Sequence, residues 1–143
     1  MSSYSQDLAD AIRAARHVYL IGNGGSYANA LHIANDLIAC GVRAFTLDPA
    51  TLTATANDHG YENLFSRWLH AVGESGDLLI APSGSGRSPN ILNAMNAANL
   101  VGMTIWPIFG AARGESMQQA EEAQIRIGHE VMALLKSRLD KSA

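Results

Sequence analysis

The 143-residue sequence has a single cysteine, Cys40, and few charged residues, with a net charge of −3. One cysteine excludes an intramolecular disulfide, and we interpret Cys40 as a small buried residue. The absence of a basic block gives no support for nucleic-acid binding. No apolar run approaches the about 20 residues that cross a membrane, and the polar start of the chain lacks the apolar core of a signal peptide. We therefore expect a soluble cytoplasmic protein that binds neither nucleic acid nor membrane.

Apolar residues make up 48% of the chain, which is enough for the core of one domain. Short apolar runs alternate with stretches of helical periodicity. The expected strands are 18–21, 43–47, 77–81 and 103–109, and the expected helices are 4–15, 26–40, 61–72, 89–101 and 115–140, with a weakly helical stretch at 51–57. This alternation predicts one domain over residues 1–143, an α/β fold with a parallel sheet of about four to five strands and helices on both faces.

Local signals place several boundaries. Ser26 is a natural N-cap for the second helix, and Gly41 is a natural stop. Ser88 and Pro89 fit the cap and the first position of a later helix. Pro107 is the point at which the last strand is expected to fray.

Two Ser/Gly-rich loops, GNGGS (22–26) and SGSGRS (83–88), each follow a buried strand and lead into a helix. In a parallel α/β sheet, ligands bind beyond the carboxyl ends of the strands, where free N–H groups of helix starts favour anions. Ser83, Ser85 and Ser88 could surround a phosphate, and Arg87 could add positive charge. The alternative is that Gly and Ser only make tight turns, but two such loops favour binding. Neither loop has a Walker lysine or the GxGxxG pattern, so the nucleotide interpretation is weak.

Three segments together resemble the sugar isomerase (SIS) domain family, especially its phosphoheptose isomerase branch. They are VYLIGNGGSYANALHIANDL, LTATANDHGYENLFSR and GDLLIAPSGSGRSPNILNAMNAANLVGMT, and the resemblance runs with gaps over about residues 17–138. It implies a three-layer α/β/α sandwich of flavodoxin-like type and a homotetramer whose active sites are shared between subunits. The implied reaction is isomerisation of sedoheptulose 7-phosphate for lipopolysaccharide or other surface glycans, in several members with zinc. A related branch without enzyme activity regulates replication initiation.

The resemblance also assigns roles to residues of the two loops and of a third segment. A threonine that is frequent in the family is replaced here by Gly84. Polar pocket positions fall on Asn23 and on the pair Asn57 and Asp58. The implied substrate- and phosphate-binding set is Asn23, Gly24, Gly25, Ser26, Asn57, Asp58, Ser83, Gly84, Ser85 and Ser88.

Two helices carry the catalytic positions that the resemblance implies. His32 matches a histidine that binds zinc or faces the sugar, and Asp36 stands where a catalytic glutamate is usual. In IGHEVMALL, His129 matches a catalytic or zinc-binding histidine. When the family pattern is aligned backwards from His129, Glu121 falls where a glutamine ligand is usual, and Gln124 falls where a histidine is usual.

Aldose–ketose isomerisation through an enediol needs a base near a carbon and an acid near the oxygens. His32 and Asp36 are four residues apart, so they share a helix face. Asp36 is the expected base and His129 its acid partner, with Glu121 as a substitute base. The same four side chains are acceptable zinc ligands. However, Glu121 and His129 lie about 12 Å apart along an ideal helix, so both reach one ion only with extended side chains, an irregular helix or a second subunit.

Simpler interpretations stand beside these assignments. His32 could make only a local hydrogen bond, Asp36 could be solvated surface, and His129 could be an interface histidine. Trp68 and Trp106 are expected to pack rather than to stack on a sugar.

The chain is also shorter than the family pattern. After Phe109 the segment AARGESMQQ leads almost directly into the last helix, so one edge strand is expected to be absent. The alternative function is therefore a catalytically inactive regulatory module that binds sugar phosphates. Retention of both His32 and His129 favours an enzyme, and we expect a homo-oligomer, either a tetramer or a dimer.

Overall fold

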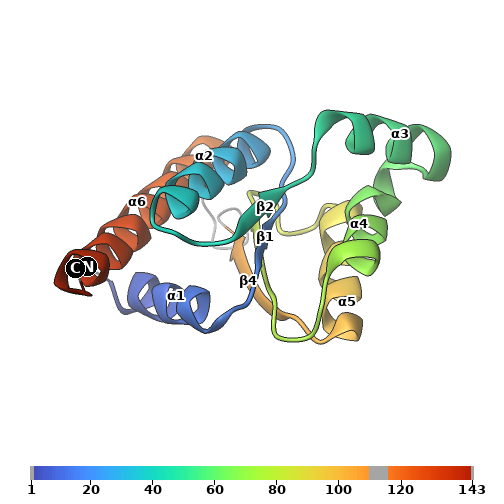
Figure 1. Ribbon diagram of the computed structural model, residues 1–143. Helices are drawn as coiled ribbons and strands as arrows, with labels where there is room; N and C mark the ends of the chain where they lie inside the picture. The colour runs from blue at the N-terminus through green and yellow to red at the C-terminus, as the bar shows by residue number, and fades with distance from the viewer. Residues whose placement is uncertain (1, 110–115, 143) are drawn as a thin grey trace.

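The computed structural model describes residues 2–109 and 116–142, with side chains described as far as residue 136 (Figure 1). The elements in chain order are α1 (Ser3–Ala14), β1 (Val18–Leu20), α2 (Gly25–Ala39), β2 (Ala44–Thr46), α3 (Pro49–His59), the 3-10 helix η1 (Tyr61–Asn63), α4 (Leu64–Val72), β3 (Leu78–Ser83), α5 (Pro89–Val101), β4 (Thr104–Phe109) and α6 (Met117–Ser142). Within this part of the chain, no helix is both long enough and apolar enough to cross a membrane.

The four strands form one parallel sheet in the order β2-β1-β3-β4. In the registers, Val18 pairs with Leu78 on one side and with Ala44 on the other. This order is the flavodoxin-like order 2-1-3-4-5 without its last strand. The predicted parallel sheet is confirmed, at the lower end of the expected strand number.

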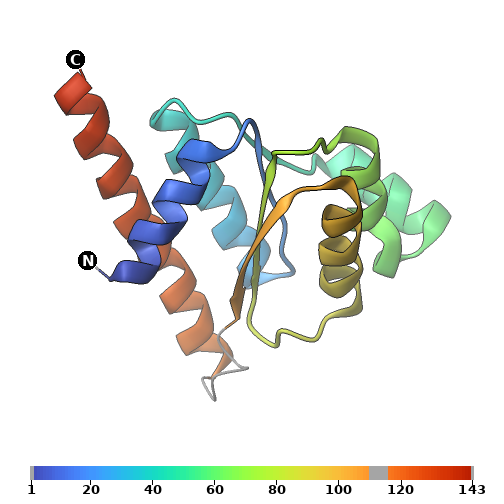
Figure 2. The ribbon, with the colours of Figure 1, turned by 90° about the horizontal axis from the view of Figure 1, so that it is seen from below.

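Helices cover both faces of the sheet (Figures 1 and 2). One core cluster joins α1, α2 and α6 to the strand face that presents Leu20 and Ile80. The other cluster joins α4 and α5 to the opposite face, which presents Ile21 and Leu79. Successive residues of a strand point to opposite faces, so the all-apolar runs seen in the sequence supply both cores. The predicted three-layer α/β/α sandwich is confirmed.

The start of α2 differs from the prediction. The helix begins at Gly25, and the preceding cap residue is Gly24, which has a φ of +55° and makes no side-chain cap hydrogen bond. The assignment of Ser26 as N-cap is therefore wrong, because Ser26 lies one residue inside the helix and its hydroxyl contacts α6 instead. Gly41, with a φ of +81°, follows the end of α2 as expected.

The helix expected over 61–72 is divided into η1 and α4. Leu64 and Leu69 are fully buried, whereas Val72, at the end of α4, is 41% exposed. The weakly helical stretch before them is the complete helix α3. Its N-cap, Asp48, accepts hydrogen bonds from the Thr51 backbone N–H and hydroxyl, which lower the pKa of the Asp48 carboxyl.

β4 continues through Pro107 without fraying, contrary to the expectation. The N–H of Thr104 donates to β3, so by the alternation of the ladder the backbone groups of Pro107 face away from β3. A proline at an outward position of an edge strand costs no ladder hydrogen bond. The Tyr4 hydroxyl donates to the Pro107 carbonyl at 3.1 Å, and the Tyr4 ring packs edge-on against Trp106. In the described ranges no strand lies beyond β4, and the link over 110–115 falls outside them.

Three smaller expectations about packing are confirmed. Cys40 is 6% exposed, and burial raises the pKa of its thiol. Trp68 and Trp106 both pack against the core clusters. Ser88 and Pro89 hold the cap and first position of α5.

A buried carboxylate joins the starts of β1 and β3. Asp77 is 0% exposed and accepts hydrogen bonds from the backbone N–H groups of His17, at 3.1 Å, and Glu74, at 2.8 Å. Its Oδ1 also lies 3.0 Å from His17 Nδ1. These contacts satisfy backbone donors at the end of the sheet opposite the two loops.

We predict that Asp77→Ala lowers the free energy of unfolding by about 2–4 kcal/mol, because buried N–H donors lose their acceptor. Asp10→Ala is the matched control, since Asp10 makes an exposed pair with Arg13 on α1 and should cost less than about 1 kcal/mol. Urea denaturation of the two variants measures the difference. Equal losses would show that Asp77 does not have this role.

Candidate functional site

The two Ser/Gly-rich loops lie side by side because they follow the neighbouring strands β1 and β3. Two reciprocal amide hydrogen bonds join them: Asn23 Nδ2 donates to Asn90 Oδ1, and Asn90 Nδ2 donates to Asn23 Oδ1, both at 2.8 Å. The Tyr61 hydroxyl donates a further bond to Asn23 Oδ1 at 2.8 Å. Asn90 is only 2% exposed. The loops are therefore held together before any ligand is bound.

The second loop is built from serine hydroxyls that accept backbone hydrogen bonds. Ser83 Oγ accepts from the N–H of Gly86, and Ser85 Oγ accepts from the N–H of Arg87. Ser85 Oγ and Ser88 Oγ lie 3.4 Å apart. A hydroxyl that accepts a backbone hydrogen bond retains its own hydrogen for an external acceptor. The Ser83 hydroxyl thus has a hydrogen to donate, and so does one hydroxyl of the Ser85–Ser88 pair, because one of the two donates to the other. Phosphate binding by these serines stays a prediction.

The first loop has two points of close approach at glycine, one to the backbone and one to the flexible end of a side chain. A Cβ on Gly22 would lie 2.7 Å from the backbone carbon of Ser26, so the turn into α2 admits no side chain there. A Cβ on Gly25 would lie 2.3 Å from Oε1 of Glu121, which comes from α6. The Glu121 carboxylate therefore lies against the first turn of α2, where the N-terminal end of a helix favours negative charge.

Ser26 and two amide side chains connect α2 to α6 behind this loop. Gln124 Nε2 donates to Ser26 Oγ at 3.1 Å, and Asn29 Nδ2 donates to Gln124 Oε1 at 2.9 Å. Ser26 and Gln124 are 3% and 0% exposed.

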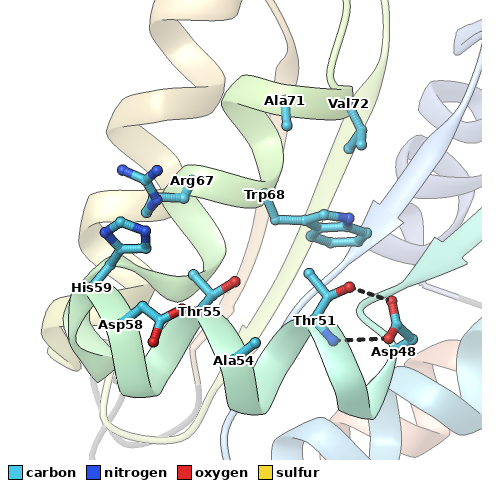
Figure 3. A pocket seen from close by; sticks show the side chains of 10 residues that line it. All are labelled: Asp48, Thr51, Ala54, Thr55, Asp58, His59, Arg67, Trp68, Ala71 and Val72. Carbon is cyan, nitrogen blue, oxygen red and sulfur yellow. Dashed lines mark hydrogen bonds between the residues drawn. The ribbon is translucent and has the colours of Figure 1, made fainter.

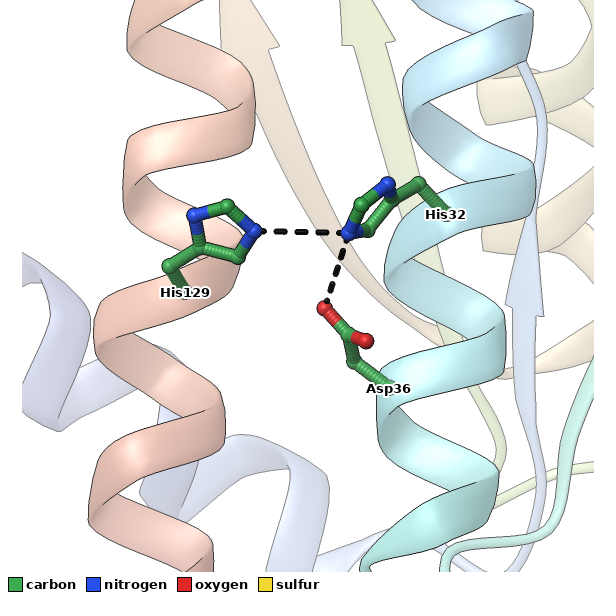
Figure 4. A group of neighbouring side chains, drawn as sticks. All are labelled: His32, Asp36 and His129. Carbon is green, nitrogen blue, oxygen red and sulfur yellow. Dashed lines mark hydrogen bonds and ion pairs between the residues drawn. The ribbon is translucent and has the colours of Figure 1, made fainter.

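Three predicted residues form a cluster between α2 and α6 (Figure 4). His32 Nε2 lies 3.3 Å from Asp36 Oδ2 and 3.3 Å from His129 Nε2. One potential ligand atom from each residue falls within 4.8 Å of the other two. Asp36 is 9% exposed, so the interpretation as solvated surface is wrong. Its Oδ2 is buried and, among the described residues, has no hydrogen-bond partner besides this ion-pair contact.

Glu121 does not belong to this cluster, although it was predicted as its fourth member. Its carboxylate lies at Gly25, seven residues and about 10 Å along α2 from His32. Glu121 is too far from the cluster because Glu121 and His129 are two turns apart on the same helix, as their spacing in the sequence indicates. The described cluster therefore has three members: His32, Asp36 and His129.

The chemistry of these three side chains fits a zinc ion. Imidazole nitrogen and carboxylate oxygen are zinc ligands, and two nitrogens about 2.0–2.1 Å from a tetrahedral zinc lie about 3.3 Å apart. That is the separation of the two histidine nitrogens. His129 and half of the His32 side chain are exposed, so a further position remains open to a substrate. Three protein ligands with one open position is the arrangement of catalytic zinc sites.

The predicted pair Asn57 and Asp58 lies on α3, and its side chains contact each other, with Asn57 Nδ2 donating to Asp58 Oδ1 at 3.0 Å. Asp58 lines a hollow of about 490 Å³ between α3 and α4, together with Thr51, Arg67 and Trp68 (Figure 3). Both side chains are exposed, and no described hydrogen bond joins either to the two loops.

Sequence reasoning missed three residues of the site. Asn29, Tyr61 and Asn90 all lie within the quoted motifs, yet none was singled out. The burial of Gln124 was also not predicted, although the sequence carried a signal for it. Gln124 shares a helix face with the buried residues Ala120, Ile127 and Val131. A polar residue in such a stripe indicates a buried hydrogen-bonding partner.

Comparison with known proteins agrees with this geometry. Residues 2–110 match the model of the SIS domain family. The chain is 36% identical to a phosphoheptose isomerase of Akkermansia muciniphila, over 89% of this chain and 79% of that protein. It is 41% identical to a phosphoheptose isomerase of a Bradyrhizobium species, over 73% of this chain and 57% of that protein. The solved phosphoheptose isomerase of Neisseria gonorrhoeae superposes with a TM-score of 0.81 at 26% identity, covering 93% of this chain and 83% of the other.

Gly84 allows a direct test of the second loop. A Cβ there would lie 2.5 Å from Met117 Cε, the free end of a side chain that is 51% exposed and can move. We predict that Gly84→Thr lowers the free energy of unfolding by about 1 kcal/mol or less and tightens binding of inorganic phosphate about fivefold, through one added hydroxyl donor.

Gly84→Val is the matched control, because valine has the shape of threonine without the hydroxyl. Titration calorimetry with phosphate and urea denaturation measure the two effects. If valine tightened binding as much as threonine, the hydroxyl would not be a phosphate donor.

Proposed function

The chain belongs to the SIS domain family, in the branch of the phosphoheptose isomerases, and we propose that it is an aldose–ketose isomerase acting on sedoheptulose 7-phosphate. The observation that carries this proposal is the placement of two kinds of chemistry along one helix. The GNGGS loop with Ser26 leads into α2, and the serines of the second loop follow the neighbouring strand β3. His32 and Asp36 lie further along α2, where His129 of α6 meets them.

The spacing suits an open-chain sugar phosphate. Ser26 and His32 are six residues apart, which is about 9 Å along an α-helix. With the phosphate on C7 bound between the loops, the carbonyl carbon C2 of an extended seven-carbon chain comes near the cluster. The Glu121 carboxylate lies near the start of this path, where it is suited to accept hydrogen bonds from sugar hydroxyls rather than to act at C1 or C2.

We assign the proton transfers to Asp36 and His129. Asp36 Oδ2, buried and otherwise without a partner among the described residues, removes a proton from C1 of the ketose while His129 donates a proton to the oxygen on C2. The enediol that results is converted to the aldose when Asp36 returns the proton to C2 and His129 takes the proton from the oxygen on C1. His32 Nε2 lies between the two groups, 3.3 Å from Asp36 Oδ2 and 3.3 Å from His129 Nε2.

The same three side chains would hold zinc, which is the cofactor that we propose. A bound ion supplies polarisation of the carbonyl and stabilisation of the enediolate. It would take the lone pairs that proton transfer uses, so the metal content of the protein decides whether Asp36 and His129 act as proton-transfer groups or as ligands.

We further propose that the protein assembles as a homo-oligomer, a tetramer or a dimer, in the cytoplasm. Leu31 and Ile38 on α2 are 45% and 57% exposed and flank the cluster in sequence. Burial of such side chains against a second subunit would stabilise the assembly by about 25 cal/mol per Å².

The proposed activity is tested by following the conversion of sedoheptulose 7-phosphate to the aldose. We expect turnover by the unaltered protein and a loss of at least about 100-fold in kcat for His129→Ala, the usual contribution of an acid–base group. His70→Ala on α4, an exposed histidine outside the cluster, should keep full activity. Thermal stabilisation by the substrate without turnover would contradict the proposal and support the regulatory alternative.

Native mass spectrometry tests the cofactor and the assembly together. We expect about one zinc per chain in dimers or tetramers, and loss of the metal from His32→Ala but not from His70→Ala. A protein that is active without zinc, and whose turnover a chelator leaves unchanged, would remove the metal assignment and leave Asp36 as the base.

A further inference from the structure

Gln124 is a fully buried polar side chain on the apolar face of α6. Its residue is 0% exposed, and its helical neighbours Ala120, Ile127 and Val131 belong to the buried core. Burial of an amide costs free energy unless both of its ends are hydrogen-bonded. Both ends of Gln124 are bonded, and its two partners, Asn29 and Ser26, come from α2 near the first loop.

The direction of these hydrogen bonds is fixed by a backbone carbonyl. Asn29 Nδ2 donates to the carbonyl oxygen of Glu121 at 2.9 Å, and that oxygen can only accept. The same Nδ2 group donates to Gln124 Oε1, so this end of Gln124 is its carbonyl. The other end is therefore the amide nitrogen, which donates to Ser26 Oγ. No alternative amide orientation satisfies all three contacts.

The consequence for Ser26 is that its oxygen accepts a bond while its own hydrogen remains available. None of the residues with described side chains accepts that hydrogen. Ser26 is 3% exposed, so bulk water has little access to it. The hydroxyl lies in the first turn of α2, next to the GNGGS loop, where the proposed substrate binds.

We propose that Gln124, held by Asn29, is a positioning residue that presents the Ser26 hydroxyl as a hydrogen-bond donor to an oxygen of the bound sugar phosphate. The proposal rests on the proposed function, because it takes Ser26 as a substrate-binding residue. It adds two residues, Gln124 and Asn29, that are not members of the cluster of His32, Asp36 and His129.

Gln124→Glu tests the direction of the hydrogen bond between Gln124 and Ser26 with almost no change in the shape of the side chain. A carboxylate has no hydrogen to donate, so Ser26 must donate to it and is lost to the substrate. We expect the KM for sedoheptulose 7-phosphate and the Kd for inorganic phosphate both to rise about tenfold, with kcat changed less than about twofold. Gln118→Glu adds the same charge at an exposed position of α6 and should leave KM and Kd unchanged.

Asn29→Asp is the second variant, for the case that a buried glutamate prevents folding. Asn29 is half-buried, and its replacement removes the donor that fixes Gln124 Oε1. The Gln124 amide is then expected to turn over and to present its carbonyl to Ser26, which produces the same rise in KM and Kd.

A double-mutant cycle separates positioning from a general loss of structure. In the Ser26→Ala background, Gln124→Glu should raise KM and Kd by less than about twofold, because the hydroxyl that it misdirects is gone. If Gln124→Glu also raised KM and Kd about tenfold in the Ser26→Ala background, the two effects would be independent and the proposal would be overturned. Failure of the unaltered protein to bind phosphate would overturn it as well. Phosphate binding with the expected cycle but without turnover would instead contradict only the isomerase assignment.

Discussion

The reciprocal amide pair between Asn23 and Asn90 is the contact on which the site depends. Each loop, taken alone, is a turn between a strand and a helix, and its donors could point in many directions. The pair fixes one loop against the other with two 2.8 Å hydrogen bonds, and Tyr61 adds a third contact from η1. Loops that are held together in this way need less ordering if a ligand binds between them. The sheet order makes the pair possible, because β1 and β3 are neighbours.

The second constraint is the close packing of α6 on α2. A Cβ on Gly128 would lie 2.6 Å from Ile33 Cγ1, so a larger residue would push the two helices apart. The next residue along α6 is His129, whose imidazole lies 3.3 Å from His32. The same interface places Gln124 behind Ser26. One helix contact therefore positions both the cluster of His32, Asp36 and His129 and the hydrogen bond from Gln124 to Ser26.

The sequence was sufficient for the features that depend on local chemistry. The parallel sheet follows from apolar runs alternating with helical periods, and the loops follow from Gly and Ser at strand ends. Features that depend on how α6 lies against α2 could not be derived, because the contacting residues are more than 90 positions apart. Glu121 was assigned to the metal cluster on the resemblance, although its spacing from His129 counted against it, and packing brings its carboxylate to Gly25. Ser26 was taken as a cap because its local pattern fits one, and the tertiary contact with Gln124 prevails.

Two departures from the family pattern, the absent edge strand and Gly84 in place of threonine, both lie near the point where α6 begins. Without a fifth strand, β4 is the edge of the described sheet, and Pro107 together with Tyr4 blunts that edge against pairing with another chain. The first turn of α6 also comes to the second loop, where Met117 occupies the space that a side chain at residue 84 would need. Glycine at this position, where the resemblance implies threonine, leaves room for the Met117 side chain and lacks the one hydroxyl that threonine would add. The serine hydroxyls of the loop are unaffected, because they are oriented by backbone groups of the loop itself.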